Sequence, residues 1–102
     1  MKSVIITGST RGIGRGLAEN FLQRGCKVVI SARKSEQVAD VVAELGQKFG
    51  ADNVTGIACD VTNAEQLSAL WQHGVDTFAT IDIWINNAGM SIQRKPLAEQ
   101  SS

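Results

Sequence analysis

The stretch TGSTRGIG at positions 7–14 decides the fold class of this 102-residue chain. A continuous run of β-branched residues at 4–6 precedes it, and apolar residues at helical spacing follow it from Gly12 onward. Continuous apolar runs are typical of strands buried on both faces, and spacings of three or four are typical of amphipathic helices. The stretch therefore predicts a strand, a tight glycine-rich turn and a helix.

The same unit recurs along the chain. We expect four strands, at 4–6, 28–30, 54–59 and 83–85. Between them lie three helical patterns, which begin near Gly12, Ser35 and Thr62. Gly25 and Gly50 are placed to end the first two helices, and Thr62 with Glu65 forms a capping box that opens the third. Strands that alternate with helices predict one α/β domain, a doubly wound parallel sheet with helices on both faces.

The composition narrows the classes of function. Ten basic and ten acidic residues give a formal net charge of zero, which argues against a protein that binds nucleic acid by neutralising many phosphates. The charge is uneven, because residues 1–34 hold seven basic residues and one acidic residue. This segment is either ordinary solvated surface or a field that attracts an anionic ligand. No apolar stretch approaches the roughly 20 residues of a membrane span, so we expect no membrane-spanning helix.

Individual apolar and sulfur-bearing residues carry structural predictions. Cys26 and Cys59 lack the paired spacing of a zinc site and the density of a disulfide scaffold, so we expect two small buried hydrophobes and no metal site. We expect Ile13, Trp71 and Phe78 to join the core through the first and third helices. The cysteine usage and the lack of a targeting pattern predict a reducing, cytoplasmic compartment.

Three candidate binding segments follow predicted strands, at the edge where an open parallel sheet places its ligands. In 7–14, glycines let a pyrophosphate approach the backbone, and the helix N-terminus offers free N–H groups to it. The alternative is a tight connection without a ligand. After the second strand no acid is present to hold ribose hydroxyls, and Arg33, with Arg11, suits a 2′-phosphate. This predicts NADP preference, unless Arg33 and Lys34 are ordinary surface charges.

After the third strand, Asp60 and Val61 provide a carboxylate and a backbone N–H that suit the polar edge of an adenine. Asp60 has an alternative role as a cap of the following helix.

The segments TGSTRGIG at 7–14, CDVT at 59–62 and INNAG at 85–89 resemble the short-chain dehydrogenase/reductase family in order and spacing. The resemblance implies a Rossmann-like sheet of strand order 3-2-1-4, with residues 1–102 as an NADP-binding domain and the C-terminal half of the family fold absent. It implies that Asn86 braces the strands. The cofactor-binding residues implied by these motifs are Gly8, Ser9, Thr10, Arg11, Gly12, Ile13, Gly14, Arg33, Asp60, Val61, Asn87, Ala88 and Gly89.

The residues that perform the family's reaction are a Ser, a Tyr and a Lys four positions after that Tyr, aided by an Asn. The chain contains no Tyr, and we assign no catalytic residue. The resemblance implies a homo-oligomeric, NADP-dependent oxidoreductase that moves hydride between nicotinamide and a small-molecule carbonyl or alcohol substrate, of which this chain alone is inactive. The alternative is a complete, non-catalytic nucleotide-binding or interaction module. A nucleic-acid-binding domain has only the basic first third in its favour.

The run from Ile81 to Gly89 is similar to the chlorophyll b reductase branch of the family, because Trp84 lies inside its fourth strand. The simpler interpretation is that Trp84 fills core volume.

Overall fold

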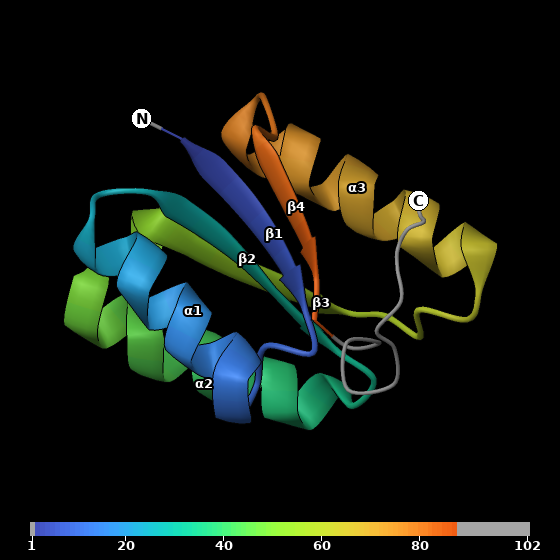
Figure 1. The fold of residues 1–102 in the computed structure, drawn as a ribbon, viewed down its shortest axis with the longest axis horizontal. Helices are drawn as coiled ribbons and strands as arrows, with labels where there is room; N and C mark the ends of the chain where they lie inside the picture. The colour runs from blue at the N-terminus through green and yellow to red at the C-terminus, as the bar shows by residue number, and fades with distance from the viewer. Residues whose placement is uncertain (1, 88–102) are drawn as a thin grey trace.

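The computed structural model describes residues 2–87 and forms a parallel sheet with helices on both faces (Figure 1). The strands are β1 (Ser3–Thr7), β2 (Lys27–Ala32), β3 (Val54–Ala58) and β4 (Ile83–Asn86). The helices are α1 (Gly12–Gln23), α2 (Ser35–Phe49), α3 (Ala64–Phe78) and the short 3₁₀ helix η1 (Ala51–Asn53). The strand order is β3-β2-β1-β4 with every pair parallel. The predicted fold class and strand order are confirmed.

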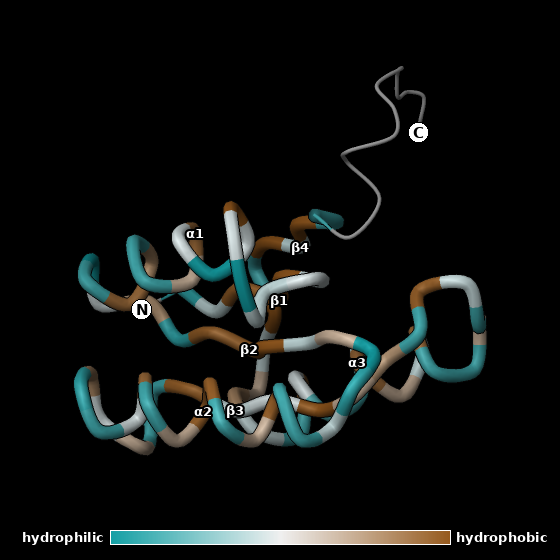
Figure 2. The backbone as a smooth tube through the Cα atoms, turned by 90° about the horizontal axis from the view of Figure 1, so that it is seen from below, coloured by the Kyte–Doolittle hydropathy of each residue, from teal (hydrophilic) through white to brown (hydrophobic). Residues whose placement is uncertain are grey.

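The central strand β1 explains why the sheet is so well buried. All five of its residues are buried, and it pairs with β2 on one side and β4 on the other. Helices α1 and α2 cover one face of the sheet and α3 covers the other (Figure 1). The hydropathy colouring shows hydrophobic stretches along β1 and β2, whereas hydrophilic and hydrophobic residues alternate along the helices (Figure 2). A strand enclosed in this way has no solvent-facing side, which is why the run at 4–6 does not alternate.

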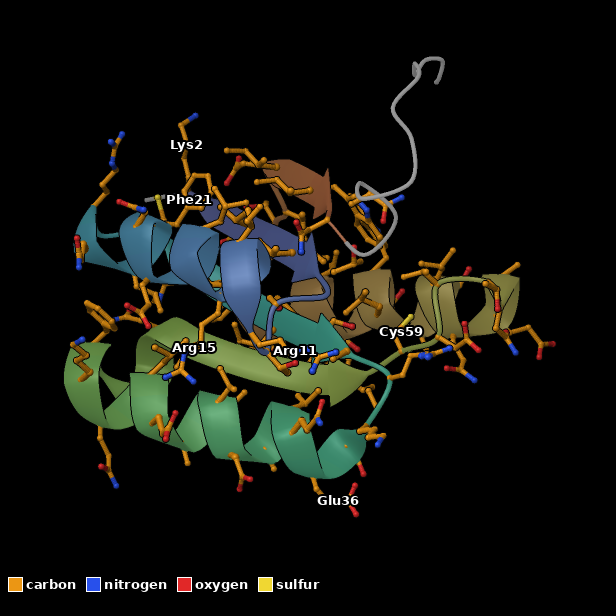
Figure 3. The ribbon with its side chains drawn as sticks, turned by 60° about the horizontal axis from the view of Figure 1, so that its bottom comes forward. Lys2, Arg11, Arg15, Phe21, Glu36 and Cys59 are labelled. Carbon is orange, nitrogen blue, oxygen red and sulfur yellow. The ribbon has the colours of Figure 1, made fainter. Side chains whose placement is uncertain are left out.

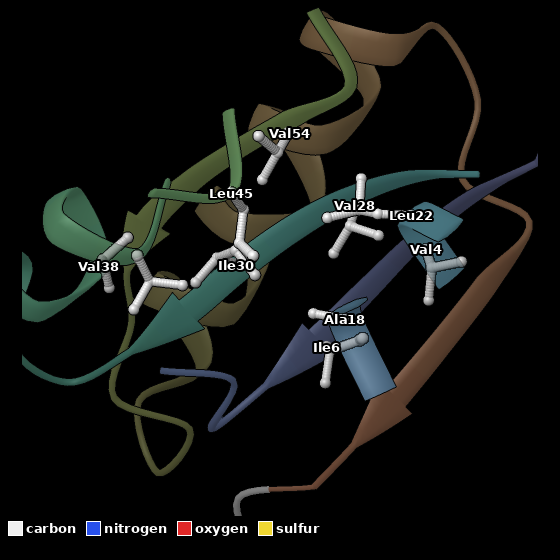
Figure 4. Close-up of a cluster of buried hydrophobic side chains, with 10 residues drawn as sticks. Val4, Ile6, Ala18, Leu22, Val28, Ile30, Val38, Leu45 and Val54 are labelled. Atoms are coloured by element: carbon white, nitrogen blue, oxygen red, sulfur yellow. The ribbon is translucent and has the colours of Figure 1, made fainter. Parts of the chain in front are cut away.

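The larger core cluster fills the space between the sheet and helices α1 and α2 (Figure 4). Its fully or nearly buried members are Val4, Ile6, Ala18, Leu22, Val28, Ile30, Val38, Val41, Leu45 and Val54. Burial of one such Val, Ile or Leu side chain stabilises the fold by about 1.5–3 kcal/mol. Arg15 adds an ion pair between the two helices, with its Nη2 2.8 Å from Glu44 Oε1.

The core between the sheet and α3 contains fewer buried side chains than the core on the other face. Its buried cluster consists of Ile5, Val29, Cys59 and Leu70. Trp71 is 45% exposed and stacks on Trp84 of β4, with ring centroids 6.1 Å apart. The prediction that Trp71 is a core residue is therefore wrong, because Leu70 takes the position under the helix. Phe78 packs against this cluster as predicted.

Two other local predictions are corrected. Ile13 is 74% exposed, because Gly14 and Ala18 are the residues that α1 turns toward the sheet. The cap of α3 is Asn63, whose Oδ1 accepts the N–H of Gln66 at 3.0 Å. The predicted capping box at Thr62 is wrong, because Asn63 still has extended backbone angles and the helix begins one residue later.

The remaining helix ends are as predicted. Gly25 and Gly50, with φ of +87° and +107°, follow α1 and α2 in conformations that glycine adopts without strain. Cys59 is buried, and Cys26 is half-buried against the larger cluster. In the part of the chain that the structure describes, no helix has the length and hydropathy needed to cross a membrane.

Candidate functional site

The glycine-rich turn between β1 and α1 is built by close backbone approach. Gly8 and Gly12 both have φ of +63°, a conformation that side chains with a Cβ rarely adopt. A Cβ on Gly14 would overlap the carbonyl oxygen of Gly8 and lie 2.6 Å from Nδ2 of Asn87. A Cβ on Gly12 would meet nothing within 4 Å. The turn is thus packed tightly on its inner side and leaves room outside Gly12.

The N-terminus of α1 has no side-chain cap. Arg11 occupies the cap position in an extended conformation, makes no capping hydrogen bond, and is followed by no acidic residue in the first turn. The first N–H groups of a helix lack intrahelical partners and carry a partial positive charge. This end of α1 therefore suits an anionic group such as a pyrophosphate.

The basic residues of the first third differ in their partners. Arg15 is paired with Glu44 and, at 3.3 Å, with Glu19, and the Glu44 hydrogen bond is the main cause that raises the pKa of Arg15. Arg11 and Arg33 are exposed and form no salt bridge within residues 2–87. Figure 3 shows Arg11 where α1 begins and Arg15 directed toward α2. Lys34, next to Arg33, is likewise exposed and forms no salt bridge in that range, so Arg11, Arg33 and Lys34 are cations available to a ligand at this end of the sheet.

Ser9 faces the strands. Its side chain is fully buried, and its Oγ donates to the carbonyl of Ile6 at 2.7 Å and accepts the N–H of Ser31 at 2.9 Å. Among the residues expected along the phosphate path, Ser9 thus contacts the sheet, whereas Thr10, Arg11 and Ile13 reach the surface in part or fully.

The ends of β2 and β3 are adjacent. Ala32 pairs with Ala58 in the sheet, and the N–H of Cys59 donates to the carbonyl of Ala32 at 2.8 Å. This brings Arg33 and Asp60 to the same edge. The buried Cys59 thiol beside them has a raised pKa, mainly through burial and also through the Asp60 charge.

Asp60 is held ionised by its own turn. Its Oδ1 accepts the hydroxyl of Thr62 at 2.7 Å and the Thr62 N–H at 2.9 Å. These two bonds lower the pKa of the Asp60 carboxyl, and the Arg33 charge lowers it further. The carboxylate therefore serves this turn, while Asn63 caps the helix. Val61 lies next to it, half-exposed.

The end of β4 is tied to the end of β1 by two asparagines. The Thr7 hydroxyl donates to Oδ1 of Asn86 at 2.9 Å, which fits the expectation that Asn86 braces the strands. Nδ2 of Asn87 donates to the carbonyl of Gly8 at 3.0 Å. The structure thus brings the candidate residues of three segments to one edge of the sheet. The predicted positions Ala88 and Gly89 lie outside the described residues.

Two residues with a structural role in or near this site, Ser31 and Asn63, were not predicted from the sequence. Ser31 holds Ser9 through its backbone, and a contact between positions 22 apart leaves no local pattern that signals it. Asn63 is preceded by Thr62, so the capping-box pattern masked it, although Asn is itself a strongly preferred cap. A cavity of about 590 Å³ around Lys27, Asp76 and Phe78 lies at the opposite end of the strands and is separate from this site.

Comparison with known proteins identifies the class. The family model for short chain dehydrogenases matches residues 2–102. The chain belongs to the short-chain dehydrogenase family, and its described residues form the N-terminal part of the family fold.

A similar curated relative is chlorophyll(ide) b reductase NOL, chloroplastic, from Oryza sativa subsp. japonica. It is 47% identical over 100 residues, which cover 97% of this chain and 29% of the relative. The chain thus spans less than a third of that relative's length. The resemblance of the Trp84 segment to the chlorophyll b reductase branch agrees with this similarity.

Two solved structures show what similar folds bind. An alcohol dehydrogenase from the archaeon Thermococcus sibiricus, complexed with 5-hydroxy-NADP, is 28% identical with a TM-score of 0.76, over 82% of this chain and 35% of that one. A short chain dehydrogenase/reductase from Burkholderia phymatum, in complex with NAD, is 29% identical with a TM-score of 0.76, over 81% of this chain and 29% of that one. The family binds nicotinamide cofactors of both kinds.

The cytoplasmic prediction is contradicted. The rice relative and its Arabidopsis thaliana counterpart, 45% identical over 97% of this chain and 28% of the relative, are both chloroplastic by name. Free cysteines indicate a reducing environment but do not distinguish one reducing compartment from another, so the composition was a poor guide to location.

Proposed function

We propose that residues 1–102 form the cofactor-binding domain of an NADP-dependent short-chain oxidoreductase. The observation that supports NADP over NAD is that two exposed guanidinium groups, of Arg11 and Arg33, lie at the same end of the sheet and form no salt bridge among residues 2–87. In addition, the residues directly after β2, at 33–35, include no acid. Arginine binds phosphate through two parallel hydrogen bonds. Arg33 would hold the 2′-phosphate and Arg11 would approach the same group.

We propose that the other candidate residues bind different parts of the cofactor. The open space outside Gly12 and the free N–H groups of α1 fit a pyrophosphate. The ionised Asp60 and the backbone N–H of Val61 would read the adenine edge, and Asn87 with Ala88 and Gly89 would run beside the ribose. When bound, the nicotinamide supplies or accepts hydride. We assign the proton transfer to no residue of this chain.

The substrate we propose is a chlorophyll(ide) b, reduced in a chloroplast. This proposal is supported by the 47% identity to the rice enzyme. We also propose that the complete protein is a homo-oligomer and that residues 1–102 alone are inactive, because the chain contains no Tyr. The test is NADPH-dependent loss of chlorophyllide b with the complete natural polypeptide. Turnover with a simple sugar or amino-acid alcohol, and none with the pigment, would contradict the substrate proposal.

The role of Arg33 has its own test. Arg33→Ala should weaken NADPH binding about tenfold or more and leave NADH binding unchanged, since hydrogen bonds to charged groups contribute about 1.5–3 kcal/mol. Arg24→Ala removes an exposed arginine at the other end of α1 and is the matched control. Equal effects of Arg33→Ala on both cofactors would contradict the NADP preference.

The alternative, a complete and non-catalytic nucleotide-binding module, predicts a smaller natural polypeptide. The intact mass of the protein from its natural source distinguishes the two. A mass near 10.9 kDa would support the module, and a mass more than about twice that, in keeping with the share of the relatives that the chain covers, would support the oxidoreductase.

A further inference from the structure

Ser9 joins the glycine turn to the end of β2 through both its main chain and its side chain. The Ser9 N–H donates to the Ser31 carbonyl at 2.9 Å, and the Ser31 N–H donates to Ser9 Oγ at 2.9 Å. The Ser9 hydroxyl in turn donates to the carbonyl of Ile6 at 2.7 Å. We refer to these three bonds as the Ser9 latch. All of them are buried, so water does not replace them readily.

The latch lies between the two proposed anion sites. The regular pairing of β1 with β2 ends at Thr7 and Ser31, and Gly8 then turns the chain with a positive φ. Ser9 re-establishes contact with β2 after that turn. Two residues beyond Ser9 is Arg11 at the start of α1, and two residues beyond Ser31 is Arg33. The latch therefore connects the start of α1, where we propose that the pyrophosphate binds, to the end of β2, where we propose that Arg33 holds the 2′-phosphate.

We propose that Ser9 is a positioning residue that sets the placement of the glycine turn relative to Arg33 and thereby determines discrimination between NADPH and NADH. The inference rests on the proposed cofactor function and adds to it a positioning role for Ser9, whose buried hydroxyl bonds to Ile6 and Ser31. NADPH must engage both anion sites at once, and its affinity depends on how well their separation is preset. NADH uses only the pyrophosphate site and tolerates a shift of one site relative to the other.

Three serine-to-alanine variants of the complete polypeptide separate this role from ordinary stability. Ser9→Ala removes the hydroxyl of the latch. Ser31→Ala keeps every latch atom, because Ser31 contributes its backbone, and its own hydroxyl only approaches the Cys59 thiol without a well-formed hydrogen bond among the described residues. Ser3→Ala truncates a buried serine at the opposite end of β1.

Dissociation constants for NADPH and NADH, with the melting temperature, are the measurements. For Ser9→Ala we expect the Kd for NADPH to rise about tenfold and that for NADH to rise less than about threefold, which is the scale of one buried hydrogen bond. Ser31→Ala and Ser3→Ala should keep the ratio of the two constants. If Ser9→Ala weakens both cofactors equally, or if its ratio matches that of the controls, Ser9 is only structural and the proposal is overturned.

Two further measurements cover the other outcomes. If the unmodified protein binds NADH as tightly as NADPH, the proposed cofactor preference fails, and this is seen before any variant is made. If Ser9→Ala does not fold, amide exchange in the unmodified protein serves as the test. NADPH should slow exchange of the Ser31 N–H more than saturating NADH does, and equal protection by both would overturn the role of Ser9.

Discussion

The connections β1–α1 and β3–α3 both lead from a parallel strand into a helix, yet they satisfy the helix ends differently. The N-terminus of α3 is capped by Asn63 and followed by Glu65 in its first turn. The N-terminus of α1 follows Arg11, which provides no cap, and has no acidic residue in its first turn. The α3 end is therefore complete within the protein, whereas the α1 end is left with N–H groups and positive charge for an external anion.

The difference comes from the residues that surround each turn. In the Asp60 turn, Oδ1 of Asp60 accepts the hydroxyl and the N–H of Thr62, and Gln66 accepts the Asp60 N–H at 2.8 Å. The glycine turn offers no such side chain on its outer side, and its tightest contacts are between Gly8, Gly14 and Asn87. Two similar strand-to-helix connections thus differ at the helix N-terminus, since that of α3 is capped by a side chain and that of α1 is not.

The largest effect is expected from closing the inner side of the glycine turn. Gly14→Ala places a Cβ against the Gly8 carbonyl, so the turn and Asn87 must move. Overpacking of this kind costs about 1–3 kcal/mol of stability, and we expect NADPH affinity to fall at least about a hundredfold, since about 2.7 kcal/mol corresponds to that factor. Urea unfolding and cofactor titration measure both.

Gly16→Ala is the matched control for that variant. Gly16 lies in the same helix, where a Cβ meets nothing within 4 Å. This change should stabilise the protein by about 0.5–1 kcal/mol because alanine is the better helix former. Unchanged cofactor binding in Gly14→Ala would show that the close packing of the turn has no functional importance.

The next effect comes from giving α1 the kind of end that α3 has. Arg11→Asp supplies a capping carboxylate, which should stabilise the helix by about 0.5–1 kcal/mol. The same carboxylate repels phosphate, so NADPH affinity should fall about tenfold or more. Arg11→Gln removes the charge without adding an acid, so its NADPH affinity should lie between that of Arg11→Asp and that of the unmodified protein. A stabilised Arg11→Asp protein with full cofactor affinity would contradict the comparison.

The reverse change at α3 should affect stability alone. Asn63→Ala removes the acceptor for the Gln66 N–H and should cost about 1 kcal/mol in the free energy of unfolding. We expect the Kd for NADPH to stay within about twofold, since the cap is not part of the proposed site. Asn63→Asp should retain most of the stability. A selective loss of cofactor affinity in Asn63→Ala would mean that the α3 end also contributes to binding.

The smallest effect concerns the Asp60 turn and its pH dependence. The pKa of Asp60 is lowered in the folded protein, mainly by the Thr62 hydroxyl. Its contribution to stability is therefore present above the unfolded pKa, about 3.9, and is lost as the pH falls through the folded pKa. Thr62→Val should move the Asp60 pKa up toward its ordinary value in an NMR titration, and Thr62→Ser should not. An unmoved pKa in Thr62→Val would exclude the hydroxyl as its cause.

Much of the fold could be predicted because burial leaves a readable pattern. The run at 4–6 and its counterpart at 28–30 are continuous because β1 and β2 are enclosed by helices. Which members of a helical stripe reach the sheet was less predictable. Ile13 and Trp71 are exposed, because the residues that their helices bury are Gly14, Ala18 and Leu22 in α1 and Leu70 and Gly74 in α3.

The candidate site was partly readable for a related reason. The glycines and Arg33 belong to local segments whose chemistry depends on spacing along the chain. The contacts of Ser9 with Ser31 and of Asn87 with Gly8 depend on strand pairing between distant positions, and no local pattern contains them. The binding roles of all these residues stay predictions until a cofactor titration is made.

The most direct test of the open α1 end is amide hydrogen exchange of the complete polypeptide with and without NADPH. We expect slower exchange for the first-turn amides of α1 at 12–14 and no change for those of α3 at 64–66. Protection of the α3 amides instead, or no protection at 12–14 at saturating NADPH, would contradict the proposed anion site at the start of α1.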